Sequence, residues 1–409
     1  MQYKEVMGGI CAPKGFAAAG VHCGIRANHT EKYDLALIKA DVRCAAAGVY
    51  TTNKVCGAPI KVDRAHLADG YAQAIVVNSG NANTCAANGV ALAEECCALV
   101  GKALNMDAKD VLPASTGVIG QPMVIDPFAR GIPAAAEKLA ATAQGSTDAA
   151  TAIMTTDTHK KEYAIQFELG GKVCTVGAIG KGSGMIAPNM ATMLAFYTTD
   201  AAVSPALLEK ALKTVVPGTY NQMSVDLDTS TNDTLIIMAS GLAGNPEICE
   251  ENADYDAFVA ALTAIAEHMC AEHAGDGEGA THLITCEVTH APDLKTARAV
   301  SRSVVCSNLF KAAVFGRDAN WGRILCAIGY TPGDFSIDKV CVRLSSKAGE
   351  VYVCENAAYH PYSEEEAAKV LAEHDILVKV DMGTGDASAK AWGCDLTYDY
   401  VKINGDYRT

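Results

Sequence analysis

The chain has 409 residues, with 33 lysines and arginines against 47 aspartates and glutamates, which gives a formal net charge of −14. Half of it is hydrophobic (50%) and 20% is charged, which excludes a disordered chain and supplies material for a large core. An acidic surface repels phosphate and argues against non-specific nucleic-acid binding, and no apolar run approaches the ~18 residues of a membrane span. The first residues, Met1–Glu5, lack the basic-then-apolar layout of a signal peptide or transit sequence. We therefore expect a soluble, cytoplasmic protein.

Strand and helix patterns alternate along the chain, which predicts an α/β or α+β fold. Residues 74–77 read as a short buried strand, and residues 91–104 carry apolar side chains at helical spacing. Ser204 and Pro205 predict the N-cap and first turn of a helix. Residues 234–238 predict another buried strand.

The same alternation continues toward the C-terminus. Residues 256–269 predict a helix with one apolar face. Ser363 and Glu366 form the pattern of a capping box, which predicts a helix that ends near His374. Residues 376–380 then predict a strand.

One region departs from this pattern. From Gly177 onward the sequence predicts a glycine-rich loop containing Lys181, which leads into Ala191-Thr192 and then into an apolar strand. Flexible backbone beside a lysine indicates close approach of a ligand or of another chain segment. We expect the chemistry of the protein to lie here.

The chain has 16 cysteines but no C-x-x-C pair, and its length is untypical of a disulfide scaffold. The pattern predicts reduced thiols in a cytoplasmic protein, several of them acting as small hydrophobic residues inside apolar runs. The residues in such runs are Cys174, Cys286, Cys326 and Cys341.

A dinucleotide fingerprint is one alternative for the glycine-rich loop. Gly182, Gly184 and Ala187 have its spacing, and Asp200 lies at about the distance of a ribose-binding acid. Pro188 falls where the helix should begin, however, and the following residues alternate like a strand. A phosphate-binding Walker loop is also excluded, because its sequence does not occur.

A calcium loop is a second alternative, because Asp226, Asp228 and Asp233 resemble its first ligands. An EF-hand needs glycine and glutamate where this chain has Thr231 and Ile237. We therefore interpret residues 226–233 as a hydrogen-bonded turn.

Histidines could also indicate a metal. His268, His273 and His282 flank Glu272 and Glu278, but the spacing of a His-Glu-x-x-His zinc site is missing. We interpret these histidines as solvated and predict no metal.

The hydroxyl of Thr192 is the best candidate nucleophile, since the sequence has no Gly-x-Ser-x-Gly elbow. A threonine hydroxyl needs an adjacent base, and its own α-amine can serve if the preceding peptide bond is cut. The small side chain of Ala191 leaves room for the Thr192 Oγ1 to attack the Ala191 carbonyl. The resulting N-to-O acyl shift gives an ester that water can open.

Taken together, blocks along nearly the whole chain resemble the glutamate N-acetyltransferase family, also called the ornithine acetyltransferase family, of arginine biosynthesis. The matching blocks are residues 8–16 (GGICAPKGF), 51–54 (TTNK), 77–83 (VNSGNAN), 115–120 (STGVIG), 154–158 (MTTDT), 181–185 (KGSGM), 191–194 (ATML), 226–233 (DLDTSTND), 276–281 (DGEGAT) and 320–325 (NWGRIL).

The resemblance implies self-cleavage between Ala191 and Thr192. The two chains, 1–191 and 192–409, would stay associated, commonly as a heterotetramer with two of each. Thr192 would take the acetyl group from N-acetylornithine and pass it to glutamate, so the small-molecule partners are these two amino acids. Some members of the family also accept acetyl from acetyl-CoA, which is therefore a second candidate donor; the family implies no cofactor.

The resemblance also assigns site residues. The Thr116 side chain and the Gly117 backbone N–H would form the oxyanion hole, and Glu278 is a candidate proton relay. The substrate-contacting positions of the family fall on Thr155, Lys181, Thr192, Glu278, Asn404 and Thr409. His282 stands where the family usually has lysine, which changes the charge expected near Glu278.

For the fold, the resemblance implies a sandwich-like α/β body of the autoprocessing N-terminal-nucleophile type. This main body would span residues 1–290, including the cleavage site. A smaller C-terminal α/β domain, residues 291–409, would close the substrate pocket.

Two other functions remain open on the residues alone. An N-terminal-threonine amidase or aminopeptidase of the same fold would use water as the acceptor instead of glutamate. A non-enzymatic module that binds an amino acid or nucleotide would remain a single chain and would not need the Thr192 hydroxyl.

Overall fold

Two β-sheets organise the chain. The computed structural model describes residues 3–26, 31–187 and 193–406. The chain divides into two compact units, a first unit of Met1–Gly182, Pro188–Val216 and Thr229–Met269, and a second unit of Ser183–Ala187, Pro217–Asp228 and Cys270–Thr409. Each unit contains one of the two sheets.

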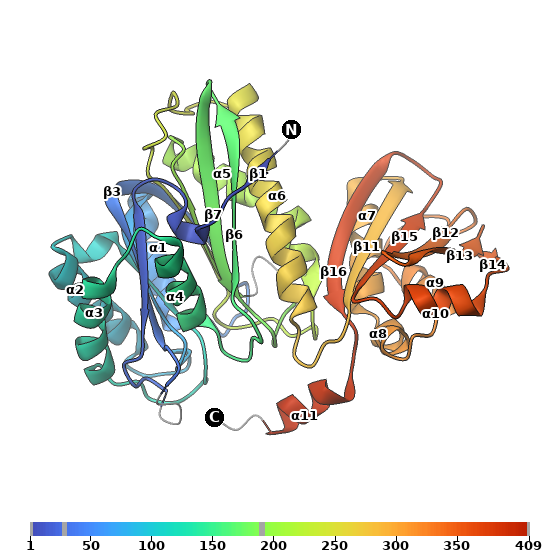
Figure 1. Ribbon diagram of the computed structural model, residues 1–409, viewed down its shortest axis with the longest axis horizontal. Helices are drawn as coiled ribbons and strands as arrows, with labels where there is room; N and C mark the ends of the chain where they lie inside the picture. Colours follow the sequence, from blue (N-terminus) through green and yellow to red (C-terminus); the bar gives the residue numbers. More distant parts are fainter. Residues whose placement is uncertain (1–2, 27–30, 188–192, 407–409) are drawn as a thin grey trace. The chain divides into compact units, whose positions relative to one another are not determined.

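The sheet of the first unit has the strand order β1-β6-β7-β8-β10-β3-β4-β5, with β2 paired to β3 (Figure 1). Its strands are β1 (Lys4–Glu5), β2 (Phe16–Val21), β3 (Leu35–Tyr50), β4 (Tyr71–Asn78), β5 (Val111–Ser115), β6 (Lys161–Leu169), β7 (Lys172–Lys181), β8 (Leu194–Thr199) and β10 (Thr234–Ala239). The β8–β10 and β4–β5 pairs are parallel, and the other pairs are antiparallel.

Helices cover both faces of this sheet around β3. Leu35 and Leu37 pack with residues of α1 (Ala58–His66), α2 (Gly89–Leu104) and α3 (Asp126–Lys138). Ala36 and Ile38 point to the other face and pack with α4 (Ala143–Ile153). Because successive strand residues face opposite sides, a strand buried on both sides reads as a continuous apolar run. This explains the continuous apolar run of residues 74–77 within β4.

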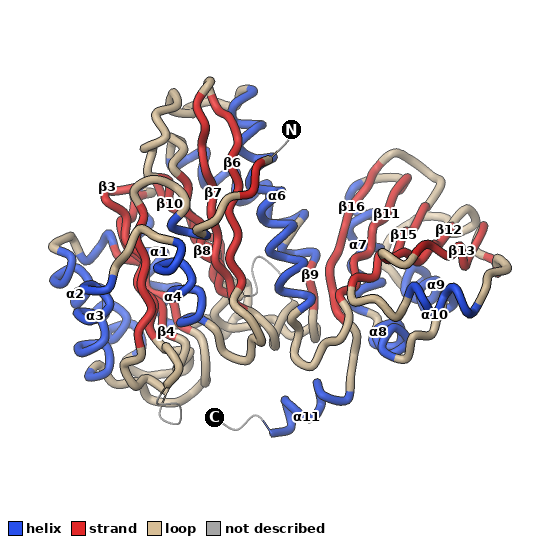
Figure 2. Tube along the Cα trace, viewed as in Figure 1, coloured by secondary structure: helices blue, strands red, loops and turns tan. Residues whose placement is uncertain are grey.

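The sheet of the second unit has the order β14-β13-β12-β15-β11-β16-β9 (Figure 2). Its strands are β9 (Met223–Ser224), β11 (Leu283–Ala291), β12 (Cys341–Ser346), β13 (Gly349–Glu355), β14 (Ala358–Tyr359), β15 (Asp375–Asp381) and β16 (Ala387–Cys394). Alternate residues of β11 and β15 form a core with the buried faces of α7 (Leu294–Cys306), α8 (Asn308–Phe315) and α9 (Trp321–Gly329). The remaining helices of the chain are α5 (Pro205–Val215), α6 (Ala253–Gly275), α10 (Glu364–Val370) and α11 (Tyr398–Asp406).

The α/β class and the elements expected from the sequence are confirmed. They correspond to β4, α2, α5, β10, α6, α10 and β15. Two details differ. The helix that Ser363 caps ends at Val370 rather than near His374, and the stretch from Gly177 to Lys181 lies in β7, paired with β6 and β8, rather than in a loop.

The division into units also differs from the expected 1–290 and 291–409. The second unit begins its longest segment at Cys270 and includes two short pieces from the middle of the chain. Residue 290 lies inside β11, a strand in the interior of that unit's sheet. A domain boundary at residue 290 would divide a strand that is hydrogen-bonded within the sheet of the second unit. The second unit therefore begins earlier in the sequence than expected.

The sixteen cysteines are all free thiols, as expected. Cys174 and Cys286 are buried in the cores of their units, and Cys341 is partly buried. Cys326 is exposed on α9, contrary to the expectation of a core position. Within the described part of the chain, none of the helices is both long and apolar enough to cross a membrane.

Candidate active site

In the first unit, the predicted oxyanion residues lie directly after β5. The Thr116 N–H donates to the Asn78 carbonyl at 2.9 Å, which fixes the chain as it leaves the strand. Gly117 has φ +127°, and a Cβ there would lie 2.7 Å from the Gly80 carbonyl carbon. Only glycine fits this position, because the loop after β4 packs against its backbone.

Lys181, at the end of β7, lies beside Thr116. Its Nζ donates to the Thr116 Oγ1 at 3.2 Å, and its side chain is mostly buried. Lys181 also pairs across the sheet with Leu194, the first residue of β8. The Met193 carbonyl accepts from the Thr234 N–H at 2.9 Å, so the chain that leaves Thr192 is anchored between β7 and β10.

The charge of Lys181 acts on two buried carboxyl groups. Burial raises the pKa of Asp157, but the charges of Lys161 and Lys181, together with the hydrogen bonds that the carboxylate accepts, lower it by more, so this pKa stays well below its ordinary value. Burial likewise raises the pKa of Asp233, and there hydrogen bonds and Lys181 oppose the shift without cancelling it.

Asp157 is a functional candidate that the sequence did not single out. One oxygen accepts from the Lys161 ammonium and from the Gly182 N–H, each at 2.8 Å, and the other accepts from the Thr155 N–H at 3.0 Å. Asp157 therefore holds two predicted site segments, around Thr155 and after Lys181, in fixed positions. It lies within the MTTDT block, but its bonding depends on residues that only the fold brings close.

A buried hydrogen-bond network joins the segment before β10 to the loops after β4 and β5. The Asn232 side-chain amide donates to the Ser115 carbonyl at 3.0 Å, and its oxygen accepts from the Thr84 and Thr231 hydroxyls at 2.6 Å each. Buried polar groups need such partners, and a fully bonded network fixes the loops that carry it. The network thereby holds Ser115, the residue before Thr116, in place.

In the second unit, Glu278 and Asn404 are brought together. The Asn404 Nδ2, on α11, donates to the Glu278 Oε2 at 2.7 Å. A Cβ at Gly184 would lie 2.4 Å from the same carboxylate oxygen, so glycine is needed where the chain passes Glu278.

Asp226 belongs to the hydrogen-bonded turn expected from the sequence and also reaches beyond it. Its carboxylate accepts from the N–H groups of Met185 and Ile186, at 2.6 and 2.9 Å, as well as from Asp228 in its own turn at 3.2 Å. Burial raises the pKa of Asp226, although these hydrogen bonds lower it in part.

The expectation that all three histidines are solvated is wrong for His273 and His282, and His268 is only partly exposed. His273 and His282 are buried, and His268 stacks on Tyr163 with the ring centroids 3.7 Å apart. Within the residues that the structure describes, no group of three or more metal-binding side chains comes together.

His282, the departure from the family pattern, is held by Asp395. Its Nδ1 lies 2.8 Å from the Asp395 Oδ2. Burial raises the pKa of Asp395, but the hydrogen bonds from His282 and Thr281 lower it by more, so it lies below its ordinary value. This buried pair is separated by 113 residues in sequence, which is why a local pattern could not reveal it.

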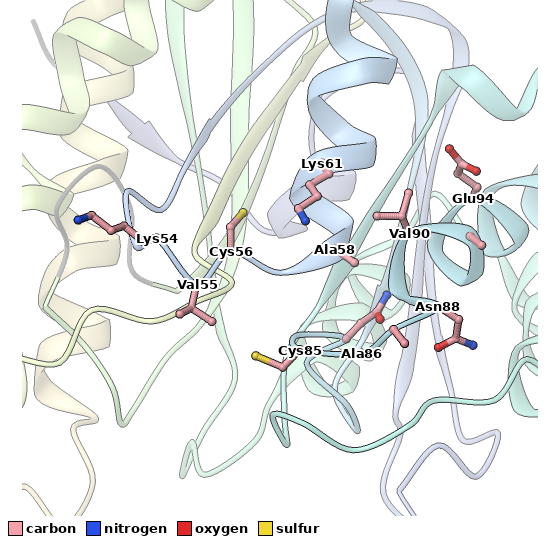
Figure 3. A pocket seen from close by; sticks show the side chains of 13 residues that line it. Lys54, Val55, Cys56, Ala58, Lys61, Cys85, Ala86, Asn88, Val90 and Glu94 are labelled. Atoms are coloured by element: carbon pink, nitrogen blue, oxygen red, sulfur yellow. The ribbon is translucent and has the colours of Figure 1, made fainter.

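Three predicted site residues, Ala191, Thr192 and Thr409, lie outside the described residues. A pocket of about 630 Å³ in the first unit is lined by residues of α1, α2 and the loops before them, and none of the predicted site residues that the structure describes lines it. Its lining includes Cys56 and Lys61 (Figure 3).

Comparison with known proteins connects the whole chain to one family. The model of the ArgJ family matches residues 17–409. The chain is 49% identical over 407 residues to the arginine biosynthesis bifunctional protein ArgJ of Symbiobacterium thermophilum, covering 98% of this chain and 99% of that protein. It is 48% identical to the protein of the same name from Caldanaerobacter subterraneus, covering 99% of this chain and 100% of that protein.

Among solved structures, the chain is 35% identical to ornithine acetyltransferase from Mycobacterium tuberculosis, solved in complex with ornithine. That match covers 46% of this chain and 100% of the solved chain, with a TM-score of 0.43. The relatives at 48–49% identity match from end to end, and the family model covers all but the first residues. The chain therefore belongs to the ArgJ family.

Proposed function

We propose that this protein is an acetyltransferase of arginine biosynthesis that cleaves itself and then moves an acetyl group from N-acetylornithine to glutamate. The observation that carries the proposal is the convergence of Thr116, Lys181 and the chain that follows Thr192 at one end of the sheet of the first unit. Membership of the ArgJ family supports the same reaction.

In the cleavage step, the Thr192 Oγ1 attacks the Ala191 carbonyl carbon. A C–O bond forms, the C–N bond breaks, and the hydroxyl proton passes to the Thr192 nitrogen. Water then opens the ester, which leaves a carboxylate on Ala191 and a free hydroxyl and amine on Thr192. The mature chains are residues 1–191 and 192–409.

In the transfer step, the Thr192 amine serves as the base for its own hydroxyl. The hydroxyl attacks the acetyl carbonyl of N-acetylornithine, and ornithine leaves with the proton on its amine. The glutamate amine then attacks the acetyl ester, which restores the Thr192 hydroxyl. Each tetrahedral intermediate carries an oxyanion, for which Thr116 and the Gly117 N–H are the proposed donors.

The remaining predicted residues would bind the substrates. Lys181 offers a cation for a carboxylate, and Glu278 offers an anion for an amine. Glu278 would also relay protons. Thr155, Asn404 and Thr409 would complete the pocket as further polar contacts.

Other features follow from the same proposal. The mature protein would be a heterotetramer of two chains of each kind, would act in the cytoplasm and would need no metal or organic cofactor. Acetyl-CoA would be a second acetyl donor, in line with the word "bifunctional" in the names of the relatives.

The test uses Thr192→Ala and Thr192→Ser variants of the full chain. We expect Thr192→Ala to remain a single chain and to transfer no acetyl, whereas Thr192→Ser keeps a hydroxyl and should still cleave. A Thr192→Ala variant that splits at this bond would contradict the mechanism. Acetyl release that is independent of glutamate would instead indicate the amidase, and an uncut wild-type chain that binds amino acids would indicate a binding module.

A further inference from the structure

Two segments of the second unit extend past the paired strands β11 and β16. Leu283 and Cys394 form the last pair at this end of the antiparallel ladder. The segment that precedes Leu283 carries Glu278, and the segment that follows Cys394 leads into α11, which carries Asn404. Side chains of the second segment hydrogen-bond to the first, so the two stay together beyond the end of the sheet.

Asp395, the residue directly after β16, makes the first of these connections. Its Oδ1 accepts from the Thr281 N–H at 2.8 Å and from the His282 N–H at 3.0 Å. Its Oδ2 accepts from the Thr281 hydroxyl and lies 2.8 Å from the His282 Nδ1. The residue is buried, and a buried carboxylate with this many partners fixes the segment that supplies them.

Thr397 makes the second connection and joins the loop to the helix. Its hydroxyl donates to the Gly279 carbonyl at 2.7 Å and accepts from the Tyr400 N–H at 3.3 Å, which is the bond of an N-cap residue. Gly279 has φ +70°, and a Cβ there would lie 2.7 Å from the Tyr400 nitrogen, so the loop and the helix approach closely. One hydroxyl therefore bonds both to the residue after Glu278 and to the first turn of α11.

The position of α11 depends on such contacts. The helix has nine residues, a length that is marginal for a helix in water, and none of these nine described residues is buried. Two other side chains of α11 also make contacts: the Tyr398 ring packs edge-on against Phe315, and Tyr400 interacts with Asp226. Both lie in the first turn. The direction of the second turn, and with it the bond from this helix to Glu278, therefore depends on how the first turn is held.

We propose that Thr397 is a positioning residue for the substrate-binding pair Glu278–Asn404 and that it acts through the first turn of α11. Asp395 supports it by fixing the neighbouring residues 281 and 282. This inference rests on the proposed function, in which Glu278 binds a substrate amine and Asn404 completes the pocket. Loss of the Thr397 hydroxyl keeps both of these side chains but misdirects Asn404, so substrate binding weakens more than the chemical step.

The test measures the Kd of ornithine by calorimetry and the steady-state kinetics of N-acetylornithine, with the whole protein in each case. Thr397→Val has nearly the same shape but makes neither hydroxyl bond. We expect it to raise Kd and KM about tenfold and to leave kcat within about threefold of wild type. Thr397→Ser keeps the hydroxyl and should restore both values.

Thr331→Val is the matched control. Thr331 lies in the same unit, is 6% exposed like Thr397, and its hydroxyl donates to the Ala327 carbonyl at 2.9 Å. The control therefore loses a comparable buried bond at a place far along the chain from α11. We expect it to bind ornithine and to turn over N-acetylornithine as the wild type does.

A purely structural role would lower the thermal midpoint of Thr397→Val but leave Kd and KM unchanged, which would overturn the proposal. A double variant tests the route through the helix. If Thr397 acts through Asn404, Thr397→Val has no further effect on Kd in an Asn404→Ala background, whereas fully additive losses would overturn the proposal. Should Thr397→Val fail to fold, Thr397→Ala also lacks the hydroxyl, and the same rise in Kd and KM is expected.

The outcomes also separate this inference from the proposed function. If the wild-type protein neither binds ornithine nor transfers acetyl, the proposed function fails. Equal Kd and KM values for wild type and Thr397→Val, with an active wild type, reject only the role of Thr397.

Discussion

The ammonium of Lys181 lies 3.2 Å from the Thr116 hydroxyl, and the residue is mostly buried. A cation in such a site interacts strongly with a substrate carboxylate, because little water screens the charge. The nearby Asp157 is also paired with Lys161, so it keeps a partner if Lys181 is removed.

We therefore expect Lys181→Met to lower kcat/KM for N-acetylornithine by about 10- to 100-fold, the effect of losing one charged hydrogen bond of ~1.5–3 kcal/mol. Steady-state kinetics of the cleaved enzyme measure this. Lys172→Met, at the exposed start of the same strand, is the control and should have wild-type kinetics. Equal kcat/KM values for the two variants would remove Lys181 from the substrate site.

A second residue matters for stability instead of catalysis. Asp63 on α1 is fully buried, and neither of its carboxyl oxygens has a hydrogen-bond partner among the described residues. Burial raises the pKa of Asp63 well above the ordinary value, because the charged form loses its hydration. The groups whose charges couple to it are Tyr50 and Cys97.

The pKa of Asp63 is higher in the folded state than in the unfolded state. The contribution of Asp63 to the free energy of unfolding is therefore fully present below the unfolded-state pKa and is lost as the pH rises toward the folded-state pKa. In that interval the free energy of unfolding falls by ~1.4 kcal/mol per pH unit. We expect Asp63→Asn, which mimics the protonated acid, to be more stable than wild type, and by a larger margin at pH 8 than at pH 5. Denaturant unfolding at both pH values measures this, with the exposed Glu95→Gln as control. A margin that does not grow with pH would show that Asp63 is ionised in the folded state.

For individual residues, the sequence was informative where a motif contains the groups that do the chemistry. The resemblance pointed to Thr116, Lys181, Glu278 and Asn404, and the structure places them in two hydrogen-bonded pairs. Asp157 and Asp226 were not recognised as parts of the site, because each acts through main-chain N–H groups of segments at least 25 and 40 residues away in sequence, apart from its own turn. Only the fold creates those contacts.

Among the elements, the capping residues provide a direct comparison. The Ser363 hydroxyl accepts from the Glu366 N–H at 3.2 Å at the start of α10, as the capping box predicts. Ser204 occupies the corresponding N-cap of α5, but its side chain makes no capping bond.

We therefore expect Ser363→Ala to lower the free energy of unfolding by about 1 kcal/mol, the usual cost of a lost N-cap. Ser204→Ala should change it by only a few tenths of that. Chemical denaturation of each variant gives the two values. Equal losses would mean that the hydroxyl bond is not what stabilises the start of α10.

The strand β7 is the element for which the prediction from the sequence was wrong. Its glycines read as a flexible loop, but Gly177 is glycine because the Gly9 carbonyl packs against it; a Cβ there would lie 1.9 Å from that oxygen. Gly9 lies 168 positions earlier in the chain, so this contact leaves no recognisable pattern in the sequence around Gly177. By contrast, α2 and β4 were predictable, because their apolar periodicity matches the faces that they bury.

For the whole molecule, the sheet of the first unit explains how a cleaved protein can stay in one piece. In that sheet β8, which follows Thr192, hydrogen-bonds to β7, which precedes Ala191, and β10 pairs with β3. Cleavage removes one peptide bond but none of these strand pairs.

We therefore expect the two mature chains to co-elute in gel filtration under native conditions and to separate only in denaturant. Both chains should be recovered in equal amounts from a single peak. Separation without denaturant would mean that the strand pairs around β8 do not persist after cleavage.

If Thr192 becomes a free N-terminal nucleophile that carries the acetyl group, the mass of the denatured protein after incubation with N-acetylornithine alone will show it. We expect two chains, the second beginning at Thr192 and heavier by one acetyl group, and we expect this acetyl group to disappear when glutamate is added. A single full-length chain, or a second chain that never gains the acetyl group, would contradict this role of Thr192.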